Sequence, residues 1–149
     1  MSRPLLVAHR GAPSGAASEN TIRAFRDAAA AGADGVEMDV RGTKDGRVAV
    51  IHDAAILRGG KRVAVRSLTL EDLRDPAVEA ADRVPPLEEA IRALLARTGV
   101  IVEVKEPDLA GRVASILTSL KADSRLPWLL VASFHPSVVK EFGRAAPGI

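Results

Sequence analysis

Acidic side chains recur at alternate positions in two apolar stretches of the sequence. Glu37 and Asp39 alternate with apolar residues in GVEMDV, and Glu103 and Lys105 alternate with valines in VEVK. Side chains two apart on a strand point to the same face. If both faces turn inward, three carboxylates and one lysine converge in one cavity. Carboxylates packed together need a counter-charge, and a hard divalent cation, Mg²⁺ or Ca²⁺, would supply it.

Basic residues and histidines stand at the ends of other apolar runs. His9 and Arg10 follow LLVA, and His52 follows VAVI. A guanidinium and an ammonium are common phosphate ligands, so Arg10 and Lys105 suit an anion clamp. Histidines can transfer protons near neutral pH. A divalent cation, a phosphate clamp and two histidines together predict the hydrolysis of a phosphate ester.

Each feature also has an ordinary structural interpretation. Glu37 and Asp39 could line the solvated face of an edge strand, because the nearby Asp45-Gly46 turn suggests an exposed hairpin. Ordinary roles also suit the other polar candidates, namely surface ion pairing for Glu103 and Lys105, core or capping contacts for His9, a strand-end turn for His52, helix capping for Glu19-Asn20-Thr21 and a helix start for His135. The functional interpretation is favoured because each successive predicted strand ends in a side chain that can bind a cation, bind a phosphate or transfer a proton.

The elements that must position these residues alternate between strands and helices. Strands are predicted over 5–9, 35–40, 47–52, 100–104 and 129–134. Helices are predicted from a cap within 18–21 to Gly32, from Pro85-Pro86 through Arg97 to Gly99, from Asp108 to about Lys121, and from Pro136, with a short helix at Thr69. This alternation predicts βαβ units and a mostly parallel sheet. In such folds the active-site residues lie at the C-terminal ends of the strands.

Composition sets the broad limits. The 149 residues, 47% of them hydrophobic, suit one domain over 1–149. A formal net charge of +2 and 3% aromatic residues argue against nucleic acid as a partner. The chain has no cysteine, which excludes disulfides and makes zinc less suitable. The first apolar stretch, Leu5 to Ala8, is too short for a signal peptide or an integral membrane segment, so we expect a cytoplasmic protein.

An ordered series of motifs runs through residues 9–53: HRG, ENT, AF, GADGVEMDV, TKDG and HD. PPLEEAI, VEVK and ASF follow later in the chain. This series resembles the N-terminal signature of the glycerophosphodiester phosphodiesterase family. The resemblance implies a TIM barrel and the metal-dependent cleavage of glycerophosphodiesters to glycerol 3-phosphate and an alcohol.

The same resemblance implies roles by position. It matches the metal-binding carboxylates to Glu37, Asp39 and Glu103, the acid–base pair to His9 and His52, and the phosphate-binding residues to Arg10 and Lys105. As a working assignment, His9 is the base and His52 the acid. The residues do not distinguish Mg²⁺ from Ca²⁺, nor do they identify the alcohol released.

The predicted strand count departs from that of a whole barrel. A TIM barrel has eight βα units and about 250 residues, whereas this sequence predicts at most five strands. We therefore expect an incomplete (βα)8-type barrel of about the first four to five units, either C-terminally truncated or completed by a second copy as a homo-oligomer. Two other functions stay open: a lysophospholipase D or sphingomyelinase D-like phosphodiesterase, and an inactive structural or phosphate-binding barrel fragment.

Overall fold

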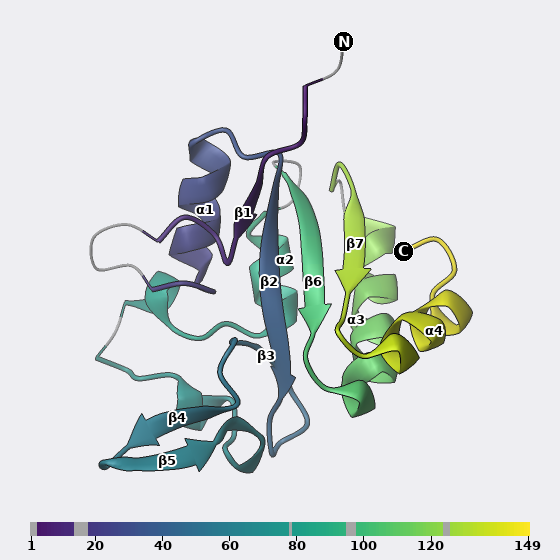
Figure 1. The fold of residues 1–149 in the computed structure, drawn as a ribbon. Helices are drawn as coiled ribbons and strands as arrows, with labels where there is room; N and C mark the ends of the chain where they lie inside the picture. The colour runs from purple at the N-terminus through teal and green to yellow at the C-terminus, as the bar shows by residue number, and fades with distance from the viewer. Residues whose placement is uncertain (1–2, 14–17, 78, 95–97, 124–125) are drawn as a thin grey trace.

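A mostly parallel sheet forms the centre of the protein (Figure 1). The computed structural model describes residues 3–13, 18–77, 79–94, 98–123 and 126–149. The sheet contains β1 (Val7–His9), β2 (Gly35–Gly42), β6 (Gly99–Val104) and β7 (Leu129–Ala132) in that order, all parallel. The predicted parallel α/β architecture is therefore confirmed.

Four α-helices pack against one face of this sheet. They are α1 (Ile22–Ala30), α2 (Leu87–Arg92), α3 (Ala110–Asp123) and α4 (Pro136–Ala145). Their apolar side chains join the buried side chains Val36, Met38 and Val40 of β2 in one core. Because strand side chains alternate, the opposite face of β2 carries Glu37 and Asp39.

The start and stop of α1 follow the predicted signals. Thr21 is the N-cap, and its Oγ1 accepts a hydrogen bond from the backbone N–H of Ala24 at 3.2 Å. Gly32 follows the last turn with a φ of +90°, a conformation that glycine adopts without a steric penalty. The backbone N–H of Ala12 donates to the Ala24 carbonyl at 2.9 Å, so this helix holds the start of the loop after β1.

A hairpin connects β2 to β3 (Val48–Val50), which pairs antiparallel with the C-terminal part of β2. The predicted Asp-Gly turn is present, and Gly46 has a φ of +72°. Strand β3 of the hairpin is not exposed, because all three of its residues are buried, and only turn residues such as Lys44 and Asp45 are exposed. The alternative of a solvated edge strand is wrong: β2 lies between β1 and β6, and Asp39 is fully buried.

Residues 53–83 hold more structure than the sequence predicts. β4 (Ala55–Arg58) and β5 (Lys61–Ala64) form a separate two-stranded sheet around Gly59-Gly60, both with positive φ. Short 3₁₀ helices are η1 (Val65–Ser67), η2 (Glu71–Leu73), η3 (Ala80–Asp82) and, further on, η4 (Pro107–Leu109). The predicted short helix at Thr69 is η2, because the side chains of Thr69 and Asp72 cap each other's backbone N–H groups.

Two predicted helix boundaries are wrong. Helix α2 ends at Arg92 rather than Arg97, and residues 95–97 lie outside the described residues. Gly99 is the first residue of β6 rather than a helix stop, and a Cβ there would come within 2.0 Å of the Trp128 ring. The glycine is needed for close packing. Asp108 lies within η4, and α3 begins two residues later.

The sheet is open within the described part of the chain. β1 and β7 are its edges, and each pairs with one neighbour. Leu5, Leu6 and Leu130 are exposed at or beside these edges. Closure of a barrel, by further strands or by a second copy, stays a prediction. No helix in the described ranges combines the length and hydrophobicity needed to cross a membrane.

Candidate functional site

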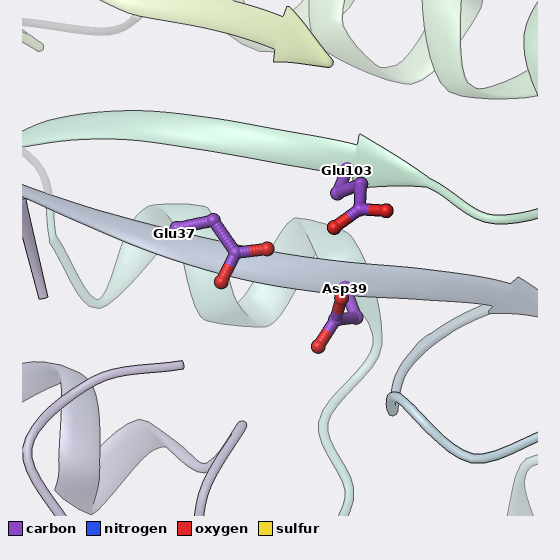
Figure 2. Close-up of side chains that lie close together, drawn as sticks. All are labelled: Glu37, Asp39 and Glu103. Atoms are coloured by element: carbon purple, nitrogen blue, oxygen red, sulfur yellow. The ribbon is translucent and has the colours of Figure 1, made fainter. Parts of the chain in front are cut away.

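Three carboxylates converge on the sheet face opposite the helices, as Figure 2 shows. Glu37 and Asp39 come from β2, and Glu103 lies opposite Asp39 in the parallel register of β6. One carboxylate oxygen from each residue lies within 4.8 Å of the others. The predicted convergence is confirmed.

Lys105 joins the cluster from the residue after β6. Its Nζ lies 2.8 Å from Asp39 Oδ1 and 2.7 Å from Glu103 Oε1. Burial acts against the charge of this ammonium, but hydrogen bonds to Asp39 and Glu103 outweigh burial, and the pKa of Lys105 is raised. The lysine therefore stays charged inside the cluster.

Arg10 reaches the same carboxylates from the loop after β1. Its Nε lies 3.0 Å from Asp39 Oδ2, and its backbone N–H donates to Glu37 Oε2 at 3.1 Å. Nη1 donates to Glu19 Oε1 at 3.0 Å. The left-handed backbone at Arg10, with a φ of +58°, turns both donors toward the cluster. The neighbouring Gly11 permits this turn, because a Cβ there would lie 2.8 Å from the backbone of Ala24.

Asn20 belongs to the site, although its sequence context suggests helix capping. Its Nδ2 donates to Asp39 Oδ2 at 2.9 Å, and its Oδ1 accepts the backbone N–H of Asp39 at 3.2 Å. The side chain is buried, and the backbone has a φ of +58°. Asparagine is one of the few residues that adopt this left-handed conformation readily. Asn20 thus orients Asp39, while the neighbouring Thr21 caps α1.

The pKa values of the two β2 carboxyl groups, Glu37 and Asp39, are shifted in opposite directions. Burial, and then the negative charge of Asp39, raise the pKa of Glu37. Burial also acts to raise the pKa of Asp39, but hydrogen bonds from Lys105 and Asn20 outweigh it and lower that pKa. Of these two carboxylates, Glu37 therefore has the weaker support from the protein.

Each of the three carboxylates has one buried oxygen without a well-aligned hydrogen-bond partner in the described part of the chain. Glu37 Oε1 is buried and has no hydrogen-bond partner among the described residues. Asp39 Oδ1 and Glu103 Oε1 lie 2.8 and 2.7 Å from the Lys105 Nζ, but neither has a well-aligned hydrogen-bond partner among the described residues. Buried oxygens of this kind are normally satisfied. A hard cation between the three carboxylates would satisfy them, so the residues present fit Mg²⁺ or Ca²⁺.

The two predicted acid–base histidines lie in different surroundings. His9 Nε2 is 3.9 Å from Glu37 Oε2, and its side chain is 71% exposed. His52 lies beyond β3 and contacts Asp53, with 3.0 Å between Nδ1 and Oδ1. The hydrogen bond with His52 lowers the pKa of Asp53. His9 thus adjoins the carboxylate cluster, whereas His52 is held by its own neighbour.

Two small hollows flank the cluster. One of about 260 Å³ is lined by Glu19, Asn20, His52 and Asp53 among others. The other, of about 200 Å³, is lined by Glu103, Ala132, Ser133 and Phe134. A larger hollow of about 760 Å³ lies elsewhere, between Arg47, Arg74 and Arg92, and holds none of the predicted site residues.

Ser133 and His135, which follow β7, have structural roles. Ser133 Oγ donates to the carbonyl of Val104 at 2.7 Å and accepts the backbone N–H of His135 at 3.1 Å. His135 is the N-cap residue of α4 but makes no side-chain cap. Its interpretation as a helix-start residue is confirmed.

Residues 9–138 match the model of the glycerophosphoryl diester phosphodiesterase family. A glycerophosphodiester phosphodiesterase from Bacillus altitudinis is 31% identical over 97% of this chain and 63% of its own length. A crystal structure of the same enzyme from Agrobacterium tumefaciens superposes with a TM-score of 0.78 at 29% identity, covering 97% of this chain and 64% of that one.

A phosphodiesterase from Oleispira antarctica, solved with the product sn-glycerol-3-phosphate, superposes with a TM-score of 0.81 at 27% identity. The match covers 98% of this chain and 64% of that structure. The chain therefore spans less than two thirds of the length of these relatives. The order of motifs, the parallel sheet and the family match lead to one conclusion: the chain belongs to the glycerophosphoryl diester phosphodiesterase family.

Proposed function

We propose that the chain is a metal-dependent phosphodiesterase that hydrolyses glycerophosphodiesters to glycerol 3-phosphate and an alcohol. The observation that carries the proposal is the cluster of Glu37, Asp39 and Glu103 beside the cations Arg10 and Lys105. Family membership supports it. The glycerol 3-phosphate bound in the Oleispira antarctica phosphodiesterase supports the product class.

The three carboxylates would hold one Mg²⁺ or Ca²⁺ ion. When bound, such an ion neutralises the negative charge that develops on a non-bridging phosphate oxygen. The cluster suits this role because it offers oxygen ligands from two adjacent strands of a rigid sheet. Oxygen-only ligands favour these hard cations over zinc.

Arg10 and Lys105 would hold the phosphate. The Lys105 ammonium has three N–H donors, and two oxygens, one from Asp39 and one from Glu103, lie within hydrogen-bond distance. Arg10 uses Nε and Nη1 for Asp39 and Glu19. Among the described residues, these contacts leave one ammonium proton and the outer guanidinium nitrogen for phosphate oxygens.

His9 and His52 would move the protons of the reaction. Asp53 holds His52 Nδ1, which leaves Nε2 to give a proton to the leaving alkoxide. His9, exposed beside Glu37, would take a proton from the attacking water or substrate hydroxyl. The cytoplasmic location stays a prediction from the sequence.

The sizes of the two hollows favour small alcohols. Pockets for drug-sized ligands measure roughly 300–1,000 Å³, whereas the hollows beside the cluster measure about 260 and 200 Å³. We therefore expect glycerophosphocholine, glycerophosphoethanolamine and glycerophosphoglycerol to be cleaved faster than lysophosphatidylcholine or sphingomyelin. The assay incubates the chain with each diester and identifies the phosphorylated product by ³¹P NMR.

Glycerol 3-phosphate as the product supports the proposal. Faster choline release from lysophosphatidylcholine would favour the lysophospholipase D alternative. No product from any diester, in the presence of either cation, would overturn the proposed hydrolysis.

Divalent cations should stabilise the fold more at neutral pH than at acidic pH. The pKa of Glu37 is raised above 4.5, so its protonation favours folding of the metal-free chain. That contribution is present below about pH 4.5 and is lost as the pH rises through the raised pKa. The lowered pKa of Asp39 has the opposite effect, but only below about pH 3.8.

A bound cation should restore the stability that the metal-free chain lacks at neutral pH. At about 100 times its Kd, an ion adds about 2.7 kcal/mol to the free energy of unfolding. We expect thermal unfolding at pH 7.5 to show a clear rise in Tm with Mg²⁺ or Ca²⁺, and a smaller rise at pH 5, because protons compete for Glu37. If the cation raises the Tm of the Glu37→Gln variant as much as that of the wild type, the ion binds elsewhere.

A further inference from the structure

Arg41 connects three of the segments that carry site residues: β2, the loop after β3 and the segment after β6. It lies on β2, two residues after Asp39 and on the same strand face. Its Nε donates to the backbone carbonyl of His52 at 2.7 Å, and its Nη1 donates to Glu106 Oε1 at 3.1 Å. Glu106 directly follows Lys105. Arg41 and Glu106 are largely buried, with side chains 15% and 18% exposed.

Glu106 binds the Arg41 guanidinium through Nη1, while Nε binds the His52 carbonyl. Its second oxygen, Oε2, accepts the backbone N–H of Gly42 at 3.1 Å. The parallel ladder between β2 and β6 ends near Val40, where the N–H of Lys105 donates to the Val40 carbonyl at 3.2 Å. The Glu106 carboxylate thus takes the place of the next strand residue. Glu106 therefore holds the Arg41 guanidinium beside the segment that follows β6.

Few hydrogen bonds hold the backbone around His52 among the described residues. The β2–β3 ladder ends at the Val40 and Val50 pair, and the N–H of Ile51 donates to the Asp39 carbonyl at 2.9 Å. The hydrogen bond from Arg41 is the next contact along the chain. The imidazole itself contacts Asp53, whose side chain is 70% exposed. The position of the ring relative to the carboxylate cluster therefore depends on its backbone.

We propose that Arg41, held by Glu106, is a positioning residue that sets the place of the His52 imidazole relative to the carboxylate cluster. The inference rests on the proposed function, in which His52 transfers a proton. The planar guanidinium suits the task, because it donates to a carbonyl and a carboxylate at the same time. An ammonium at this position keeps the charge and can still donate hydrogen bonds, but it loses the planar fork geometry.

The first test compares Arg41→Met with Arg112→Met. Arg112 is a matched control, because it also donates to a backbone carbonyl of the β2–β3 hairpin, that of Gly46, at the end away from His52. A displaced proton-transfer group costs up to about 10²-fold in rate. We expect Arg41→Met to lower kcat about 10- to 100-fold with KM within about threefold, and Arg41→Lys to recover part of the loss.

Arg112→Met should keep the kcat of the wild type. A kcat within about threefold of the wild type in Arg41→Met would overturn the inference. A matched fall in kcat, cation affinity and Tm in both variants would overturn it as well, since that pattern indicates general damage to the hairpin.

The second test does not depend on turnover. The chain has three histidines, His9, His52 and His135, so the Cε1–H region of its imidazole ¹H–¹³C spectrum holds three assignable signals. We expect Arg41→Met to shift or broaden the His52 signal and to leave those of His9 and His135 in place. An unchanged His52 signal, or an equal change in all three signals, would overturn the inference.

A further variant keeps the test decisive if Arg41→Met does not fold. Glu106→Gln retains an oxygen for the Gly42 N–H but loses the charge that holds Arg41, and the same selective change at His52 is expected. A wild-type chain without turnover would overturn the proposed function instead, and the imidazole spectrum would still decide whether Arg41 positions His52.

Discussion

Replacing Glu37 with glutamine is expected to lower the turnover of a glycerophosphodiester about 10³-fold, because a bound cation supplies several kcal/mol of transition-state stabilisation. Glu37 lies in the carboxylate cluster, and its Oε1 has no partner among the residues that the structure describes. A neutral amide in its place is a poor ligand for a hard cation. The affinity for Mg²⁺ or Ca²⁺ should fall with the turnover.

The same substitution should leave the metal-free chain at least as stable as the wild type at neutral pH. Burial and the charge of Asp39 raise the pKa of Glu37, so the folded chain carries an unfavourable negative charge there. Glutamine has nearly the same shape, and its amide oxygen can still accept the Arg10 N–H that Glu37 Oε2 accepts. Loss of activity without loss of stability is characteristic of a functional residue rather than a structural one.

Steady-state kinetics, calorimetric cation titration and thermal unfolding would check these expectations together. Glu141→Gln is the matched control, because Glu141 is an exposed carboxylate on α4 outside the site. Unchanged turnover in Glu37→Gln would contradict the assignment of Glu37 as a ligand. A marked loss of stability in the metal-free variant would contradict the account of its burial.

Replacing His52 with alanine is expected to lower kcat about 10²- to 10⁴-fold, the usual contribution of a general acid or base. Asp53 holds Nδ1 of the ring, which leaves Nε2 available for the leaving group. Cation affinity should not change, because no hydrogen bond or ion pair joins the His52 ring to Glu37, Asp39 or Glu103 within the described part of the chain. A pH–rate profile with two limbs in the wild type should lose one limb in this variant.

His135→Ala serves as the matched control, since His135 begins α4 and its side chain makes no cap. It should keep the turnover and both limbs of the profile. Near-full turnover in His52→Ala would exclude His52 from proton transfer. A parallel loss in both histidine variants would point to damage to the fold instead.

The carboxylate cluster could be predicted because it depends on a simple periodicity. Alternation in GVEMDV and VEVK places the acidic side chains on one face of each strand, and the parallel register of β2 and β6 then sets Asp39 beside Glu103. The capping segment 18–21, Gly32 and Pro136 also placed the start and stop of α1 and the start of α4, because capping and proline geometry act locally.

The rest of the site depends on contacts between residues distant in the sequence. The cap of α1 could have been any of several residues, and the contact between Asn20 and Asp39 spans 19 positions. Gly99 resembles a helix stop until Trp128 packs against it. The contact of Arg41 with Glu106 spans 65 positions. The one local signal for Asn20 was its tolerance of left-handed backbone, which a capping role does not require.

The central claim is that the carboxylate cluster makes this chain a metal-dependent glycerophosphodiesterase. The most direct measurement is the initial rate of glycerol 3-phosphate release from glycerophosphocholine by the chain, first stripped with EDTA and then titrated with Mg²⁺ or Ca²⁺. We predict no release in EDTA and a saturable recovery with at least one of the two cations. An equal rate in EDTA, or no release at any concentration of either cation, would contradict the claim.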